Sequence, residues 1–235
     1  MKILAMDTSA KAASVAITDG ETPLAVYSLE AGRTHSETVL PMVESALKVA
    51  HLTLDDINLF AVTNGPGSFT GVRIGISTVK GLAFGTGKPC VGVSTLLALA
   101  YNLKDVRDDC FLCPVMDARR NQLYNALFDY RNGEFHRLCE DRLIAMSDLQ
   151  KELDALDKPI YGVGDGYDLL AGNFPELKVT PILLRPQNAY SVALCALSEY
   201  EKTADKNGFT DTVLLPKYLR ASQAERELAE KEKGE

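Results

Sequence analysis

Two short acidic segments carry side chains whose type and position could do chemistry. Asp7-Thr8-Ser9 follows a buried apolar run at the start of the sequence, and Asp117 follows a similar run 110 positions later. A carboxylate at the end of a strand can orient a metal-bound phosphate, so Asp7, Thr8, Ser9 and Asp117 are candidate nucleotide-binding residues. Acidic residues also favour turns for purely local reasons. The sequence leaves both interpretations open.

A third segment, His35-Ser-Glu37-Thr-Val39, has half of a metal-binding pattern. Two imidazoles four residues apart on one helical face can bind a metal ion, but here an aliphatic side chain occupies the second position. The other two histidines do not lie at ligand spacing from His35. Thr34 and Glu37 stand at capping-box spacing, so we interpret His35 as a polar residue at a helix start. We predict no metal site.

Potential nucleophiles lack the surroundings that would activate them. Ser68 lies in a glycine-rich loop that is not Gly-x-Ser-x-Gly and has no histidine nearby in the sequence. Cys110 and Cys113 lie in an apolar stretch that reads as a strand, where residues three apart point to opposite faces. We therefore predict two buried strand thiols and no catalytic residue in this chain.

Composition limits the class of protein. The chain has 235 residues, 46% hydrophobic and 24% charged, which is enough for two small domains with proper cores. A net charge of −7 argues against a freestanding nucleic-acid binder, so any RNA contact is expected to be shared with a partner. No charged and apolar leader opens the sequence, and no apolar run reaches the ~20 residues of a membrane span. We expect a cytoplasmic protein without membrane contact.

The elements that must position these residues form a repeated pattern. In the first half, the sequence predicts strands over 2–6, 13–18, 24–29, 59–63 and 90–93. It predicts helices over 36–50, over the glycine-rich segment that ends at about 85, and after Ser94. In the second half, it predicts strands over 111–116, 122–130, 134–140 and 159–163, a capping box at 147–150, and a helix over 191–202. Strand, acidic turn, strand, hairpin and strand therefore occur twice.

This repeat indicates a duplicated α/β fold with a cleft between two lobes. We place the lobes at residues 1–103 and 104–235. The arrangement resembles the actin, sugar kinase and Hsp70 superfamily (ASKHA, RNase H-like), in which the first hairpin of each lobe faces a nucleotide phosphate tail. Here Lys11, Ala12 and Ala13 replace the glycines that a phosphate-cradling turn would need, and Arg119 does so in the second lobe. We expect the isolated chain to bind ATP poorly or not at all.

Residues Asn64–Gly75 form a turn that leads into a helix rich in small residues. Pro66 fixes its own φ and Gly65 can take a positive φ, so the chain should turn sharply after the strand. Gly71 and Gly75 are poor helix formers, which indicates that backbone or ligand approaches this helix closely. Pro41 lies within the preceding helical segment, so that helix should either begin near Thr38 or kink.

The same two helical segments are candidates for a docking surface. The apolar positions of 39–50 form a stripe that is wider than one core contact requires, and those of 71–83 form a packed stripe beside the glycines. Some of these residues should contact a partner and others should pack within their own domain. The candidate partner-binding residues are Val39, Leu40, Met42, Val43, Ala46, Leu47, Gly71, Val72, Gly75, Ile76 and Val79.

The opening Met1–Ser9, Thr34-His-Ser-Glu37 with Pro41, and Asn64–Gly75 together resemble the TsaB (YeaZ) family of bacterial tRNA threonylcarbamoyladenosine biosynthesis subunits. The match is strong over the first hundred residues and thinner afterwards. The resemblance implies a non-catalytic paralogue of TsaD, which transfers the threonylcarbamoyl group to an adenosine beside the tRNA anticodon. A catalytic TsaD-like subunit is expected to carry His-x-Glu-x-His, which this chain lacks.

The resemblance further implies a scaffold and activator that pairs with TsaD through the two helices and self-pairs when TsaD is absent. TsaE, an ATPase, and tRNA would join the complex, and ATP would act at its interface or on partners, so that this chain requires no cofactor. The alternative is a self-sufficient ATP-dependent enzyme of the same fold; a metallopeptidase is less favoured because Val39 replaces a metal ligand. The charged run 222–235 reads as a solvated helix or tail.

Overall fold

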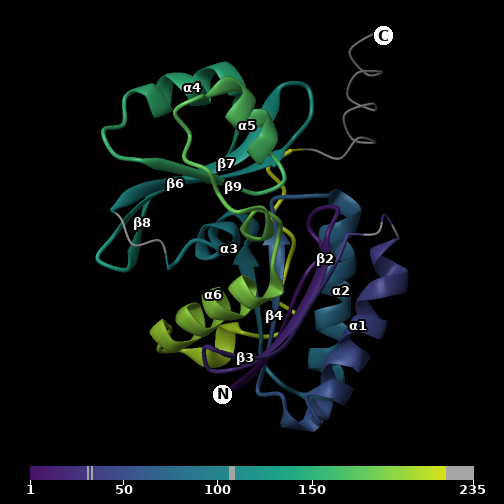
Figure 1. Ribbon diagram of the computed structural model, residues 1–235. Helices are drawn as coiled ribbons and strands as arrows, with labels where there is room; N and C mark the ends of the chain where they lie inside the picture. The colour runs from purple at the N-terminus through teal and green to yellow at the C-terminus, as the bar shows by residue number, and fades with distance from the viewer. Residues whose placement is uncertain (31, 33, 106–108, 221–235) are drawn as a thin grey trace, which may run out of the picture.

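The computed structural model describes residues 1–30, 32, 34–105 and 109–220. Its described residues form two sheets (Figure 1). The first has the strand order β3-β2-β1-β4-β5, with β1 and β2 antiparallel and β1 parallel to β4. Its strands are β1 (Lys2–Asp7), β2 (Ala13–Asp19), β3 (Thr22–Leu29), β4 (Leu59–Gly65) and β5 (Cys90–Ser94).

The second sheet repeats the order of the first four strands, as β8-β7-β6-β9. Again the first two strands in the chain pair antiparallel and the first pairs parallel with the last. The predicted duplication is therefore confirmed. Its strands are β6 (Cys110–Asp117), β7 (Gln122–Arg131), β8 (Glu134–Ala145) and β9 (Ile160–Val163).

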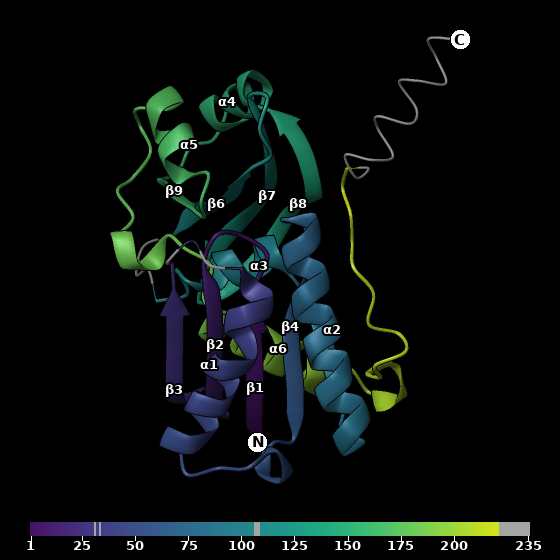
Figure 2. The same cartoon turned by 90° about the vertical axis from the view of Figure 1, so that its right-hand side faces the viewer.

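Helices cover both faces of each sheet. On the first sheet, α1 and α2 lie side by side on one face, and α3 and α6 on the other (Figures 1 and 2). On the second sheet, α3 covers one face while α4 and α5 cover the other. The helices are α1 (His35–Val49), α2 (Phe69–Thr86), α3 (Thr95–Tyr101), α4 (Met146–Asp154), α5 (Tyr167–Asn173) and α6 (Ala189–Lys202), with short 3-10 turns η1 (Leu54–Asp56), η2 (Ile182–Leu184) and η3 (Lys206–Gly208).

Alternate residues of the same strand enter different cores because side chains of a strand alternate between faces. Leu4 and Met6 pack under α1 and α2, whereas Ile3 and Ala5 pack against α6. In β6, Cys110 packs against α3 and Cys113 against the α4 and α5 side. The prediction of two buried strand thiols is confirmed, and burial raises the pKa of Cys113 to about 12.

The chain returns to the first lobe after the second sheet. We predicted that residues 104–235 form the second lobe, but the small apolar face of α6 packs on the first sheet, through residues such as Val192 and Ala196. Leu214 also enters the core under α2. The 103/104 boundary separates the two sheets correctly but misplaces α6, because an apolar helix pattern does not specify which sheet covers it. The predicted charged run 222–235 lies outside the described residues.

Most predicted elements agree with the structure to within a few residues, with two local differences. The Thr34 side chain makes no capping hydrogen bond, and α1 begins at His35 with Pro41 inside it. Ala145, rather than Ser147, precedes α4, so the second predicted capping box is wrong. The predicted Ser94 cap is confirmed, because its hydroxyl accepts from the Leu97 amide at 3.1 Å. No described helix combines the length and apolar character that crossing a membrane would require.

Candidate functional site between the two hairpins

Asp7 lies at the end of β1, where the strand enters the first hairpin. Its side chain is 1% exposed, and one carboxylate oxygen accepts hydrogen bonds from the Ser9 amide at 2.8 Å and the Ser9 hydroxyl at 2.6 Å. Burial raises the pKa of Asp7, and the hydrogen bonds from Ser9 act in the opposite direction. The Asp7 carboxylate therefore stabilises the turn formed by residues 7–9.

Helix α2 packs directly onto this turn through its glycines. The Thr8 hydroxyl donates to the Gly71 carbonyl at 2.7 Å. A Cβ atom on Gly71 would lie 2.0 Å from the Thr8 carbonyl oxygen, and one on Gly75 would lie 2.5 Å from the Thr8 hydroxyl. The predicted close approach is confirmed, and what approaches the helix is the chain's own first hairpin. Thr8 and Ser9 are accordingly 0% exposed.

His35 also closes the first hairpin. Its Nε2 lies 2.7 Å from the Ala10 carbonyl oxygen, while its Nδ1 is buried with no partner among the described residues. Val39, four residues on, is 1% exposed in the core under α1. Within the described part of the chain, no group of three or more metal-ligating side chains is close enough to hold a metal ion.

Asp117 occupies the equivalent position at the end of β6. One oxygen of its carboxylate accepts from the Arg119 amide at 2.7 Å, which is the same turn that Ser9 makes with Asp7. In contrast to Asp7, Asp117 is exposed. The next residues, Arg119, Arg120 and Asn121, have φ values of 62°, 55° and 56°. Left-handed backbone is strained for side chains other than glycine, so this turn is held by its surroundings.

Asp165 links the two hairpins electrostatically, and sequence reasoning did not single it out. It lies two residues after the end of β9, and its carboxylate accepts a hydrogen bond from the side-chain amide nitrogen of Gln187 at 3.4 Å. The pKa of Asp165 is raised to about 6, mainly by burial and to a smaller extent by the negative charges of Asp117 and Asp7. The signal that could have found Asp165 was its position between Gly164 and Gly166 just after a strand. The aspartates of the two hairpins also lie at the ends of strands.

The polar groups at the start of the first hairpin are used by the chain's own contacts. The Ser9 carbonyl accepts from the Ser68 amide at 2.7 Å, and the Ala10 carbonyl is bonded to His35. A phosphate needs free backbone N–H donors, and the Ser9 amide already donates to the Asp7 carboxylate. The structure brings Asp7, Thr8 and Ser9 together in a turn that packs against α1 and α2. The fourth candidate, Asp117, lies on the other lobe.

The predicted partner-binding residues are mostly inside the first lobe. Val39, Val43, Ala46 and Leu47 of α1 are buried, as are Gly71, Val72, Gly75, Ile76 and Val79 of α2. Met42 is half-buried, and Leu40 is 46% exposed. Nine of the eleven candidates therefore pack within their own lobe in this chain. The stripe looked wide because the sheet and the neighbouring helix both cover it.

Other positions of the same two helices meet solvent. On α2, Phe84 is 81% exposed, and Cβ atoms on Gly81 and Gly85 would have no neighbour within 4 Å among the described residues. On α1, Val49 is 63% exposed. Mid-helix glycine costs about 1 kcal/mol relative to alanine, and nothing in the described lobe needs these two glycines. Gly81, Phe84 and Gly85 lie on one exposed side of α2. We call this side of the helix pair the α1–α2 face.

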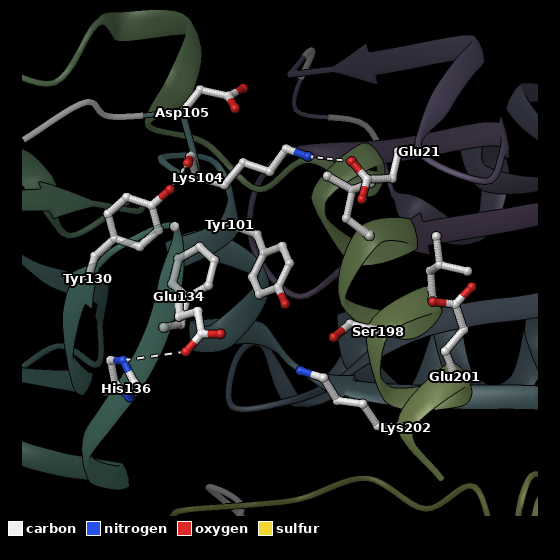
Figure 3. A pocket seen from close by; sticks show the side chains of 14 residues that line it. Glu21, Tyr101, Lys104, Asp105, Tyr130, Glu134, His136, Ser198, Glu201 and Lys202 are labelled. Atoms are coloured by element: carbon white, nitrogen blue, oxygen red, sulfur yellow. Dashed lines mark hydrogen bonds and ion pairs between the residues drawn. The ribbon is translucent and has the colours of Figure 1, made fainter. Parts of the chain in front are cut away.

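A groove of about 680 Å³ lies on the α3 and α6 side of the molecule (Figure 3). Its walls come from α3, the β7–β8 turn and α6, and the Lys104 ammonium reaches across to Glu21 at 2.9 Å. Tyr101 stacks on Phe135 with ring centroids 4.4 Å apart. The groove contains none of the residues that the sequence predicted, and its rim carries charges of both signs.

Comparison with known proteins decides the family. A family model described as "TsaD: tRNA N6-adenosine threonylcarbamoyltransferase" matches residues 26–228. The chain is 31% identical over 236 residues to the protein of Bacillus subtilis named "tRNA threonylcarbamoyladenosine biosynthesis protein TsaB", covering 99% of this chain and 100% of that one. The chain belongs to the TsaB family. The predicted resemblance is confirmed over the full length, including the second half, where the motifs are thin.

Solved structures confirm the fold expected of a TsaB-family chain. The YeaZ structure from Pseudomonas aeruginosa superposes with a TM-score of 0.74 at 26% identity, covering 93% of this chain and 99% of that one. The activator of 2-hydroxyisocaproyl-CoA dehydratase from Clostridium difficile, solved with ADPNP, gives 0.52 at 12% identity, covering 86% and 96%. This second likeness shows the fold alone: the two-lobed actin-like fold is shared.

Proposed function

We propose that this TsaB-family chain is the non-catalytic scaffold and activator of a bacterial complex that forms threonylcarbamoyladenosine beside the tRNA anticodon. The observation that carries the proposal is the full-length match to a protein named for this biosynthesis. In the proposal, a TsaD-type subunit performs the transfer. The chain works in the cytoplasm, needs no cofactor, and leaves ATP to the complex interface or to partners.

The α1–α2 face is the docking site in this proposal. Phe84 supplies a large exposed apolar side chain, and Gly81 and Gly85 leave room for another helix to approach the backbone. The partner in the proposal is a TsaD-type protein. The match of this chain to the TsaD family model over most of its length supports this choice, since a related fold would offer similar helices for pairing. Docking would favour the competent conformation of that partner over its idle one.

The remaining partners follow from the same arrangement. In the absence of TsaD, two copies of this chain pair through the α1–α2 face, since an isologous contact uses the same patch twice. The TsaE ATPase and tRNA join the paired subunits rather than this chain alone. The net charge of −7 supports the view that tRNA is shared with a partner.

Reconstitution tests the activator role directly. Threonylcarbamoylation of tRNA by the partners from the same organism should fall to background when this chain is omitted. Undiminished product without it would remove the activator role and favour the alternative, a self-sufficient ATP-dependent enzyme. Calorimetry of the isolated chain with ATP and Mg²⁺ then distinguishes the two, because the enzyme must bind nucleotide and the scaffold need not.

Phe84→Arg tests the docking face. A charge at this position should weaken pairing with TsaD by at least about tenfold, because an unpaired charge would be desolvated in the interface. Leu183→Arg in η2 is the matched control, since Leu183 is 84% exposed and Phe84 81%. Size-exclusion chromatography and calorimetry report the pairing. Equal pairing by both variants would place the interface elsewhere.

A further inference from the structure

The C-terminal described segment joins the two lobes on the α2 side. We call residues 213–220 the strap; it runs upward past α2 toward the second lobe (Figure 2). On the first lobe, Leu214 is buried under α2 and the Lys217 amide donates to the Asn64 carbonyl at 2.7 Å. On the second lobe, Arg220 Nη1 donates to the Ala118 carbonyl at 2.9 Å.

The strap brings a third arginine to the left-handed turn. Ala118 directly precedes Arg119 and Arg120, and the turn is closed by the Gln122 amide, which donates to the Arg119 carbonyl at 3.1 Å. Both turn arginines are exposed. The Arg220 guanidinium at the base of this turn therefore lies beside two further guanidinium-bearing residues.

Two residues before Arg220, the strap carries an aromatic stack. Tyr218 stacks on Phe69 with ring centroids 4.5 Å apart, and Arg73 lies 3.9 Å above the Phe69 ring. Arg73 Nε also donates to the Tyr218 hydroxyl at 2.7 Å. Tyr218 remains 39% exposed. An aromatic platform with an arginine beside it therefore lies two residues along the chain from Arg220.

Arg119 and Arg120 differ from the other described arginines of the second lobe. Arg131, Arg137, Arg142 and Arg185 all pair with carboxylates. Within the described residues, Arg73, Arg119, Arg120 and Arg220 take part in no ion pair. The nearby Asp117 carboxylate is bonded to a backbone amide instead. Unneutralised cations gathered on a chain of net charge −7 indicate a polyanionic partner.

We propose that the strap and the left-handed turn form a contact surface for an RNA strand. Arg119, Arg120 and Arg220 meet phosphates, and the exposed part of Tyr218 stacks on an unpaired base. Single-stranded RNA is favoured over an acidic protein surface because aromatic platforms interleaved with cations suit bases and phosphates together. The inference rests on the proposed function, which supplies an RNA with a loop as the substrate of the complex.

The test measures tRNA binding by the full chain paired with its TsaD partner. Fluorescence anisotropy over about 50 to 200 mM salt gives both the affinity and its salt slope. The double variant Arg119→Ala/Arg120→Ala should bind tRNA at least about tenfold more weakly and lower the slope by roughly 1.4, at about 0.7 for each single-strand phosphate contact. Arg119→Lys/Arg120→Lys keeps the charge and should retain the slope.

Control variants separate this surface from general charge and from folding. Lys151→Ala/Lys178→Ala removes two charges from exposed positions elsewhere on the second lobe and should leave the slope unchanged. Tyr218→Ala should weaken binding at least about fivefold, whereas Tyr218→Phe keeps the ring and should bind like wild type. Thermal unfolding and pairing with TsaD are measured for every variant.

Two outcomes would overturn the inference. One is an Arg119→Ala/Arg120→Ala variant that pairs with TsaD and binds tRNA with the wild-type affinity and slope. The other is a variant that loses pairing together with tRNA binding while still folded, which would make the surface a protein contact. Failure of the proposed function has a different signature, because the wild-type chain would then neither pair with TsaD nor stimulate it.

Discussion

The two hairpins begin in the same way and end with opposite surroundings. Asp7 and Asp117 each close a turn onto a backbone amide two residues later. The first turn is buried beneath α2 and bonded to His35, whereas the second is exposed and left-handed. In the first lobe the turn has become a packing element. In the second it stays open, with arginines on it, and so remains available to a ligand.

Gly71→Ala should have the largest effect, because it attacks the packing of the first hairpin. The new Cβ would lie 2.0 Å from the Thr8 carbonyl oxygen, so backbone must move, at a cost of about 3 kcal/mol or more. Gly81→Ala on the same helix is the control: no atom of the described residues would lie within 4 Å of the new Cβ, and the free energy of unfolding of the isolated chain should rise by about 1 kcal/mol. Urea unfolding measures both. Equal stability of the two variants would mean that α2 does not rest on the turn.

Asp165→Asn should have the next largest effect, because it removes a carboxyl whose pKa is raised by burial and by both hairpin aspartates. Because the pKa of Asp165 is raised from 3.8 to about 6, its contribution to stability is fully present below pH 4 and is lost as the pH rises through 6. At pH 7 the ionised carboxyl costs up to about 3 kcal/mol, at 1.36 kcal/mol per unit. The variant should therefore be more stable than wild type at pH 7.

The pH dependence of unfolding provides the check on Asp165. The stability difference between Asp165→Asn and wild type should shrink between pH 7 and pH 4. Asp168→Asn is the control, because the Asp168 side chain is 92% exposed and pairs with Arg185 at the surface. A difference that stays constant with pH would show that Asp165 is not a strained carboxyl.

Arg120→Gly should have the smallest effect on stability, and it tests the exposed turn of the second hairpin. Glycine adopts a φ of 55° without strain, so the variant should unfold at equal stability or up to about 1 kcal/mol higher. Lys151→Gly, in the exposed surface of α4, should instead lose about 1 kcal/mol. Denaturant midpoints compare them. A large loss in Arg120→Gly would mean that the arginine side chain supports the fold.

Sequence reasoning worked where a feature is local and failed where distant segments meet. It predicted that a neighbour approaches Gly71 and Gly75 closely, because those glycines disfavour a helix without such a reason. It predicted docking roles for Val72 and Val79, both of which lie in the core, because amphipathic periodicity shows a face and not what covers it. Sequence reasoning treated Arg119 only as a residue that replaces a glycine. It did not predict the left-handed backbone conformation of Arg119, because composition does not specify φ.

The sequence by itself determined the duplicated strand order, the two acidic turns and the family, because periodicity, turn residues and motifs are encoded within short windows. Only the tertiary structure decided that α6 covers the first sheet, that the first turn is filled, and that Arg220 reaches Ala118 across 102 positions. The reason is physical: packing of side chains far apart in the chain selects among arrangements that local preferences leave equally open.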